Sequence, residues 1–166
     1  MKKVAINGLG RIGRLVLREY IRNRPANLEL VAVNDLVSAE NIAYLMKYDS
    51  VHGKFEHDVT FGDDHITIDG ARINFYHQAD PHNLPWDTLG VDLVIDCTGV
   101  FTHHDKAAFH QQAGAVTGGA TASTTGAFTT TASTRVDGRS ITRAVTSGSG
   151  GALTGTGMDI GLSANS

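Results

Sequence analysis

The fold of this chain is decided near its amino terminus by the stretch KKVAINGLGRIGR, residues 2–14. An apolar run over residues 4–6 is typical of a buried strand, and it leads directly into the pattern Gly8-x-Gly10-x-x-Gly13. Apolar residues then recur at helical spacing, which predicts that a helix begins within the glycine motif. A strand, a tight turn and a helix amino terminus together predict an anion site, because the outward N–H groups carry partial positive charge.

Each glycine has an expected role in a pyrophosphate site. Gly8 permits the tight turn, Gly10 lets the pyrophosphate approach the backbone, and Gly13 lets the helix pack closely on the strand. A second apolar run, over residues 28–33, ends in Asn34-Asp35, and this acid follows the glycines by about twenty residues. A dinucleotide site needs a carboxylate there for the adenosine ribose hydroxyls. The alternative is a glycine turn followed by an unrelated, solvated Asp.

The bulk properties limit the possible partners and compartments. The chain has 166 residues, enough for one domain with an appendage, and its formal net charge is −3. That slightly acidic balance predicts neither a nucleic-acid partner nor an acidic membrane surface. The single cysteine excludes a disulfide framework within the chain and fits a cytoplasmic location. No signal peptide or membrane span is expected from the sequence.

Composition divides the chain into two parts, a domain over residues 1–114 and a tail over residues 115–166. Thr, Gly, Ala and Ser dominate the tail, and large apolar residues are few and scattered in it. Three interpretations are open: a shift of reading frame near residue 115, a disordered tail, or a threonine-rich β extension that packs on the edge of the sheet. If the sheet strands expected after residue 115 are lost, a parallel edge would be exposed, which predicts marginal stability or association.

The remaining pattern predicts an α/β fold, a partial Rossmann-type doubly wound parallel sheet with an antiparallel meander insert and a low-complexity C-terminal tail. Helices are expected to about Asn23 and over residues 38–48 and 103–112, and a loop is expected over residues 48–53 with Gly53 left-handed. Further strands are expected over residues 59–61, 66–68, 73–75 and 91–96, with a turn or 3₁₀ piece over residues 80–86 in which Trp86 covers apolar surface.

Several stretches together resemble the cofactor domain of the phosphorylating glyceraldehyde-3-phosphate dehydrogenases. They cover about two-thirds of the chain in the family's order, namely INGLGRIGR (6–14), VNDL (33–36), KYDSVHG (47–53), LPW (84–86), DCTGVF (96–101) and, more weakly, QAGA (112–115). The sister erythrose-4-phosphate dehydrogenases share most of these stretches, so this half does not fix the aldehyde. The aspartate-semialdehyde type of dehydrogenase would not be expected to carry the loop over residues 48–53 together with residues 96–101.

The resemblance implies a glycolytic oxidoreductase domain that binds NAD. It implies that Arg11 and Ile12 meet the pyrophosphate through their backbone, that Asn34 and Asp35 hold the adenine ribose, and that the remaining cofactor-binding residues are Asn7, Gly8, Gly10, Gly13, Thr98, Gly99 and Phe101. Asp35 followed by apolar Leu36 favours NAD over NADP, because a 2′-phosphate beside that carboxylate would be repelled. The family also implies a homo-oligomer.

The catalytic part of that family is missing from this chain. Its Ser-x-Cys-Thr-Thr-Asn motif is absent, and neither Cys nor His follows His110. Cys97 is expected to be a small packed side chain rather than a nucleophile. No catalytic residue is therefore assigned, and activity stays open. The alternatives to an inactive NAD-binding fragment are a non-enzymatic assembly module on a Rossmann scaffold, an erythrose-4-phosphate dehydrogenase-like fragment, or a chain that does not fold stably.

The other polar clusters have simpler explanations. His103, His104 and His110 could form a weak surface metal site, but a solvated helix face explains them more simply, so no metal is assigned. A solvated face is also expected for the basic residues of the first helix, which are Arg11, Arg14, Arg18, Arg22 and Arg24. His52 is expected to have a structural role, bracing a subunit contact or the cofactor groove.

Overall fold

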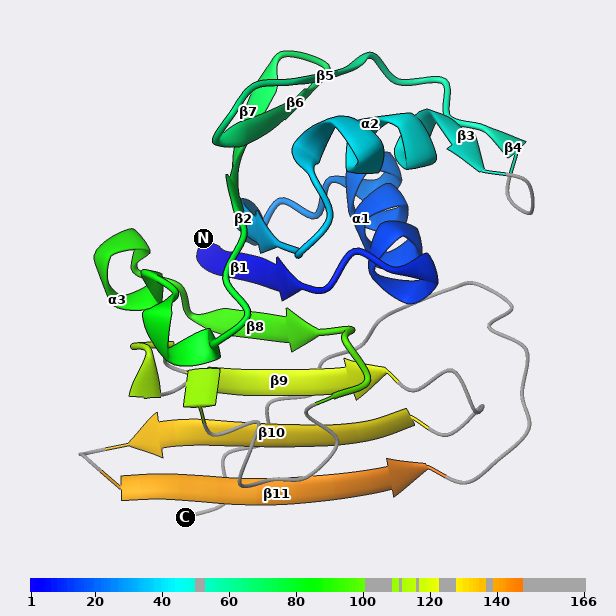
Figure 1. Cartoon of the computed structure of the whole chain (residues 1–166). Helices are drawn as coiled ribbons and strands as arrows, with labels where there is room; N and C mark the ends of the chain where they lie inside the picture. Colours follow the sequence, from blue (N-terminus) through cyan, green and yellow to red (C-terminus); the bar gives the residue numbers. More distant parts are fainter. Residues whose placement is uncertain are drawn as a thin grey trace.

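The computed structural model of this chain describes residues 1–49, 53–100, 109–110 and 112–115, and the strands over 117–122, 128–136 and 139–147. Of those last three strands only the backbone is described. One nine-stranded sheet extends through the described part of the molecule (Figure 1). The helices α1 (Arg11–Asn23) and α2 (Ala39–Lys47) lie beside its amino-terminal strands, and α3 (Trp86–Leu89) lies on the other side. The architecture is α/β, as the sequence predicts.

Five parallel strands form the centre of this sheet. In spatial order they are β9 (Thr117–Ala122), β8 (Leu93–Asp96), β1 (Lys2–Asn7), β2 (Leu28–Asn34) and β7 (Ala71–Tyr76). The chain adds strands outward from β1 through β2 to β7, then returns to add β8 on the other side of β1. This is the strand order of a Rossmann fold, and its direction reverses between β1 and β8.

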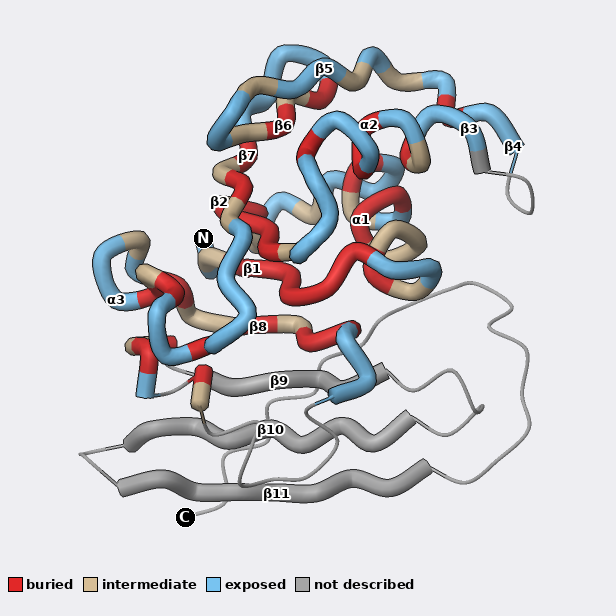
Figure 2. The backbone as a smooth tube through the Cα atoms, viewed as in Figure 1, coloured by how far each residue is buried: buried red, intermediate tan, exposed pale blue. Residues whose placement is uncertain are grey.

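Helices α1 (Arg11–Asn23) and α2 (Ala39–Lys47) cover one face of the sheet. Leu17 and Ile21 of α1 pack with Val4 and Ile6 of β1 in one buried apolar cluster. The Ser38 hydroxyl caps α2 by accepting a hydrogen bond from the Asn41 N–H at 3.3 Å, which confirms the expected helix start. In Figure 2 burial is continuous over most of β1, whereas buried and exposed stretches alternate along α1 and α2.

The opposite face of the sheet is covered by α3 (Trp86–Leu89) and the 3₁₀ turn η1 (Pro81–Asn83). Trp86 is fully buried, as expected, and packs with Val94 of β8 and Ala5 of β1. Alternate residues of β1 thus enter different clusters, with Val4 and Ile6 on one side and Ala5 on the other. Burial on both faces is what a parallel sheet requires.

An antiparallel meander continues the sheet beyond β7 and confirms the predicted insert. It consists of β5 (Val59–Phe61), β6 (His65–Ile68) and β7, with Ile66 and Ile68 fully buried. Asp69 and Gly70 join β6 to β7 with φ angles of 50° and 80°, as in the hairpin turn that favours Asp-Gly. Positive φ at both positions is the reason why this dipeptide stands there.

The loop expected over residues 48–53 contains a small hairpin instead. Strands β3 (Tyr48–Asp49) and β4 (Gly53–Lys54) pair antiparallel, and Gly53 has the predicted left-handed conformation with φ 73°. A pair of two-residue strands has no alternation to detect, so its period cannot be read from the sequence. Residues 50–52, including His52, lie outside the described residues.

The expectation of an exposed parallel edge at β8 is wrong. β9 pairs parallel with β8, and β10 (Phe128–Val136) and β11 (Arg139–Ser147) follow it in antiparallel pairing. The described strands pair as the third interpretation of the tail, a β extension on the edge of the sheet, would require. Thr and the β-branched residues favour strands, which explains how a tail of such low complexity pairs with a sheet.

The solvated face expected for the arginines of α1 is wrong at Arg18. This residue is 1% exposed, and its guanidinium donates to the carbonyls of Met46 at 2.6 Å and Gly53 at 3.1 Å. It also lies over the Phe55 ring at 5.1 Å from the centroid. Arg18 therefore joins α1 to the end of α2 and to the β3–β4 hairpin. The other arginine side chains of this set are exposed or half-buried.

Candidate dinucleotide-binding site

The predicted site residues that the structure describes meet at the carboxyl ends of three adjacent strands. Asn7 ends β1, Asn34 ends β2, and Thr98 and Gly99 follow β8. Ligands of open parallel sheets bind at this end, in the crevice where the strand order reverses. The described residues of the site therefore lie at the point between β1 and β8 that the topology favours.

The glycine turn after β1 packs directly against the loop after β8. Gly8 has φ 89°, and a Cβ placed there would lie 2.8 Å from the Thr98 methyl carbon. A Cβ on Gly13 would overlap the carbonyl oxygen of Gly8 and lie 3.4 Å from the Cys97 Cβ. Both glycines are therefore required by close approach. The roles predicted for Gly8 and Gly13 are consistent with this geometry.

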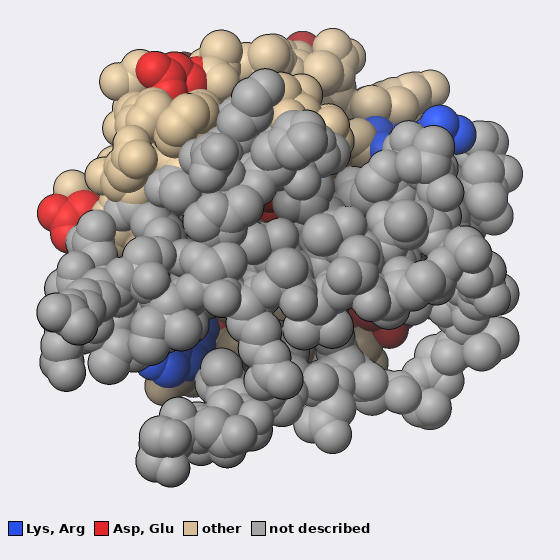
Figure 3. All heavy atoms as spheres, turned by 90° about the horizontal axis from the view of Figure 1, so that it is seen from below, with Lys and Arg blue, Asp and Glu red and all other residues tan. Residues whose placement is uncertain are grey.

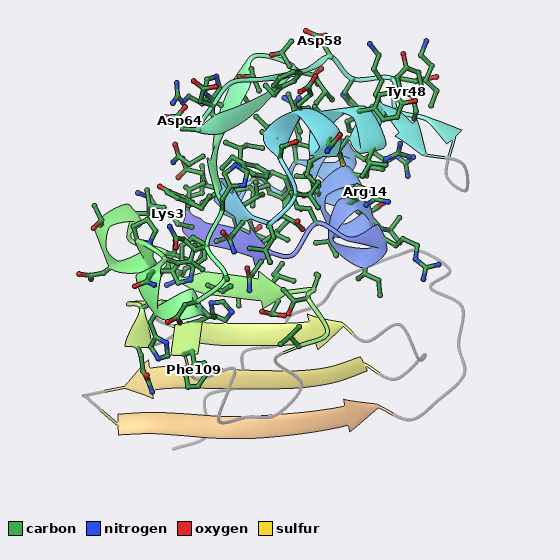
Figure 4. All side chains as sticks on the ribbon, viewed as in Figure 1. Lys3, Arg14, Tyr48, Asp58, Asp64 and Phe109 are labelled. Carbon is green, nitrogen blue, oxygen red and sulfur yellow. The ribbon has the colours of Figure 1, made fainter. Side chains whose placement is uncertain are left out.

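Gly10 has the opposite surroundings, since a Cβ placed there would meet no atom of the described residues within 4 Å. It is the N-cap of α1, and no side chain caps this helix end. The first turn is closed by the Arg14 N–H, which donates to the Gly10 carbonyl at 3.0 Å. The Arg14 side chain, labelled in Figure 4, donates to the Leu9 carbonyl at 3.1 Å and fixes the turn. With no side-chain cap and no described atom near its outer side, this helix amino terminus fits an anion such as a pyrophosphate.

Asp35 lies at the base of the glycine turn. One carboxylate oxygen accepts the Leu9 N–H at 2.5 Å, and the other accepts the Val37 N–H at 2.8 Å. A carboxylate has about four lone-pair positions, so acceptor capacity remains for ribose hydroxyls. The carboxylate thus orients the turn and keeps room for a ligand. Leu36, which follows it, is 70% exposed.

The two asparagines of the site are buried and bonded to each other. The Asn34 amide N donates to Asn7 Oδ1 at 2.7 Å and to the Gln78 carbonyl at 2.9 Å, and Asn34 Oδ1 accepts the Gln78 N–H at 2.8 Å. Asn7 is 2% exposed and Asn34 3%. Their side chains therefore hold the ends of β1, β2 and β7 together beneath the site.

Asp96, at the end of β8, continues this network. Its Oδ2 accepts from the Asn7 amide at 2.8 Å, and its Oδ1 accepts from the Thr98 backbone N–H at 3.0 Å and hydroxyl at 2.7 Å. The residue is fully buried. One carboxylate thus connects the strand end before the glycine turn to the loop after β8.

His110, like Asp96, belongs to this network but was not among the predicted site residues. It is fully buried, so the solvated helix face expected for it is wrong. Its Nε2 lies 3.0 Å from Asp96 Oδ2, and the Trp86 indole N–H donates to its Nδ1 at 3.2 Å. Because an indole only donates, Nδ1 must accept, which assigns the ring proton to Nε2 as a donor to Asp96.

One signal for a buried His110 was available in the sequence. Ala113 lies three positions further on, and the two residues share a helix face. Ala113 is also buried. A small apolar residue at that spacing indicates a face that packs inward.

The electrostatics of the two neighbours at the end of β8 differ. Burial raises the pKa of Asp96, but the hydrogen bonds from His110, Thr98 and Asn7 outweigh burial, so the pKa lies below its usual value. Burial, together with the adjacent Asp96 charge, raises the pKa of Cys97 to about 12. Cys97 is therefore a protonated, packed thiol at neutral pH, which is the role expected from the sequence.

Three expectations lie outside the described residues, namely those for Phe101, for the paired histidines His103 and His104, and for most of the helix over residues 103–112. Within the described part of the chain, no three His, Cys, Asp or Glu side chains gather closely enough to hold a metal ion. A separate hollow lined by Tyr20, Arg24 and Arg72 lies at the amino ends of β1, β2 and β7. It is at the wrong end of the sheet for a dinucleotide.

The sequence of residues 2–104 matches the family model of the glyceraldehyde 3-phosphate dehydrogenase NAD binding domain. The chain belongs to this family. Its NAD-binding domain has the Rossmann architecture described above, and the match covers the glycine turn, Asp35 and the loop after β8. NAD is the cofactor of the family's domain. The residue assignments within the site stay predictions.

Similarity to curated glyceraldehyde-3-phosphate dehydrogenases extends slightly further along the chain. The protein of Thermotoga maritima is 49% identical over 115 residues, which is 69% of this chain and 34% of that protein. Glyceraldehyde-3-phosphate dehydrogenase 1 of Kluyveromyces lactis is 53% identical over 116 residues, 69% of this chain and 35% of that protein. The chain thus spans about a third of the length of these relatives.

The described surface carries charges of both signs. Seen from below, Lys and Arg side chains and Asp and Glu side chains occupy separate places rather than one continuous patch (Figure 3). Of the helices in the described residues, none has the length and apolar character that crossing a membrane would need.

Proposed function

We propose that this chain binds NAD at the carboxyl ends of β1, β2 and β8 and does not catalyse aldehyde oxidation alone. The observation that carries the proposal is the uncapped amino terminus of α1 at Gly10, which no described atom covers on its outer side, beside the Asp35 carboxylate. The helix end would hold the pyrophosphate, and Asp35 would accept hydrogen bonds from the adenosine ribose. NAD, when bound, would supply a hydride acceptor.

The proposed contacts divide into two kinds. Gly8, Gly10, Arg11, Ile12 and Gly13 would line the pyrophosphate through their backbone, and Thr98, Gly99 and Phe101 would line the dinucleotide groove. Asn7 and Asn34 would act beneath the cofactor, because their buried amides already bond to other residues. Asp35 beside apolar, exposed Leu36 favours NAD over NADP by like-charge repulsion.

Calorimetry of the full chain with NAD tests this proposal. We expect saturable binding that Gly10→Val blocks by filling the open side of the helix end, and that Asp35→Ala weakens by about tenfold or more. ADP-ribose should bind nearly as well as NAD, because the described contacts lie on that half. NADP should bind more weakly. The proposal would be contradicted if the wild-type chain did not bind NAD, or if both variants bound NAD with the same affinity as the wild type.

The activity, partners and location of this chain follow the same proposal. With glyceraldehyde 3-phosphate and phosphate, the chain alone should form no NADH, because the only cysteine, Cys97, is a packed thiol with a raised pKa. Self-association would use the outer edge of β11, which is the edge strand of the sheet among the described residues. Sedimentation over a range of concentrations measures it. A cytoplasmic location is consistent with the single cysteine.

A further inference from the structure

We propose that His110 is a positioning residue for the dinucleotide site, acting through Asp96 on the glycine turn and on the loop after β8. His110 would not touch the cofactor. The inference rests on the proposed NAD binding, and it assigns a task to a residue that lies beyond residues 2–104, the part of the chain that the family model matches.

Asp96 is the link that makes this action possible. Its two oxygens bind different loops, with Oδ2 accepting from Asn7 and Oδ1 accepting twice from Thr98. Asn7 immediately precedes Gly8, and Thr98 lies against the position that a Gly8 Cβ would occupy. A rotation of this carboxylate would therefore move both walls of the site at the point where they meet.

His110 fixes the orientation of that carboxylate. Its Nε2 contacts Oδ2 at 3.0 Å, the same oxygen that accepts from Asn7. Both Asp96 and His110 are fully buried, so water would not replace a lost donor without a local opening. The Trp86 indole holds the imidazole from its other side at 3.2 Å. The ring is therefore oriented from two directions, as in the carboxylate–histidine pairs that orient groups at other protein sites.

The segment that carries His110 is itself anchored to α3. The Ala115 N–H donates to the His110 carbonyl at 3.0 Å, and the Asp87 N–H donates to the Ala113 carbonyl at 3.2 Å. Phe109, labelled in Figure 4 below α3, packs its ring 4.5 Å from the His82 ring. The position of His110 is thus set by residues 109–115, and the cofactor-binding unit should extend to Ala115.

The test compares three variants of the full chain by calorimetry with NAD. His110→Leu removes the donor to Asp96 and the acceptor for Trp86, and should weaken NAD binding by about tenfold or more. His110→Gln keeps one donor and one acceptor, and should restore affinity to within about threefold of wild type. Leu84→Ala is the matched control. Leu84 is buried in the same apolar cluster as Trp86, the indole partner of His110, but its side chain cannot form a hydrogen bond. It should lose stability while its affinity stays within about twofold.

Amide hydrogen exchange without NAD is the second measurement, and it is independent of cofactor binding. His110→Leu should selectively speed exchange of the Thr98 amide, which Asp96 accepts, whereas Leu84→Ala should not. If His110→Leu binds NAD as Leu84→Ala does, or if Gln fails to rescue, the positioning role is wrong while NAD binding stands. If the wild type binds no NAD, the proposed function fails, and the exchange of Thr98 alone decides whether His110 orders the loop.

Discussion

The sheet has two halves that are built by different means. In the amino-terminal half, β1, β2 and β8 carry buried apolar side chains on both faces and end in a hydrogen-bonded polar network. In the carboxyl-terminal half, β9, β10 and β11 are rich in Gly, Ala, Ser and Thr, and what the structure describes of them is backbone pairing. The β10–β11 pairing is regular, whereas the β9–β10 and β8–β9 pairings each contain one shift of register.

This difference shows that many sequences can form paired strands, whereas a ligand site depends on the identity of particular residues. Backbone N–H and C=O groups pair in any sequence with enough strand propensity. A ligand site instead requires particular side chains at particular strand ends, such as Asn7, Asn34 and Asp96. We therefore expect substitutions in the first half to be costly and substitutions in the second half to be mild.

The largest expected difference between the halves is at their glycines. Gly13→Ala should destabilise the chain by about 3 kcal/mol or more and abolish NAD binding, although Ala normally favours a helix, because the new Cβ would overlap the Gly8 carbonyl. Gly118→Ala in β9 should change stability by less than about 1 kcal/mol. Thermal unfolding of both variants measures this. Equal losses would contradict the comparison.

A smaller difference between the halves is expected when a large apolar side chain is truncated. Leu17→Ala removes a side chain that is 1% exposed between α1 and the sheet, and should cost about 2–5 kcal/mol. Ile141→Ala in β11, the outermost strand, should cost less than about 1 kcal/mol. Urea unfolding followed by circular dichroism compares the two. A greater loss from Ile141→Ala would show that the second half also depends on a packed core.

Acid should destabilise the first half selectively. The pKa of Asp96 is lowered in the folded chain, so its contribution to stability is full above its unfolded pKa and is lost as pH falls through its folded pKa. That loss begins below about pH 5, given an ordinary Asp pKa of about 3.9. Strands β9–β11 contain no Asp or Glu.

Denaturant midpoints measured between pH 7 and pH 3 test this pH dependence. The wild type should lose stability over that range, and Asp96→Asn, which starts less stable, should lose less of it. Hydrogen exchange at low pH should show that the amides of β1 and β8 lose protection before those of β10 and β11. An identical acid dependence in Asp96→Asn would show that other carboxylates carry the effect.

The smallest effect is expected at Cys97. With its pKa raised to about 12, this thiol should resist alkylation by iodoacetamide at pH 8 until the chain unfolds. Cys97→Ala should leave the affinity for NAD within about twofold of wild type, because the side chain packs behind Gly13 rather than facing the open side of the turn. Mass spectrometry gives the extent of labelling. Rapid labelling of the native chain would contradict a packed thiol.

The sequence predicted the parts of this fold that have a local signature. The strand, glycine turn and helix over residues 2–23, the Ser38 cap and the Asp69-Gly70 hairpin all follow from residue type and spacing, and the structure confirms each. Asp35 was placed by its distance along the chain from the glycines. Its position at the base of the turn agrees with that expectation.

The parts that the sequence did not predict depend on contacts between distant segments. Arg18 was assigned to a solvated face because its partners, the carbonyls of Met46 and Gly53, come from another element. His110 was treated as a surface residue because Asp96 and Trp86 reach it only through the fold. A strand at β9 was only one of three interpretations of the tail, because a run of Gly, Ala and Thr has no apolar alternation.

The most direct test of the account is an NMR titration of the full chain with NAD, in which glycine amides from both halves are followed together. We predict that the amides of Gly8, Gly10, Gly13 and Gly99 shift in a saturable manner, while those of Gly118 and Gly119 in β9 do not move. Shifts concentrated in β9–β11, or no shift in the glycine turn at saturating NAD, would contradict a site built by the amino-terminal half.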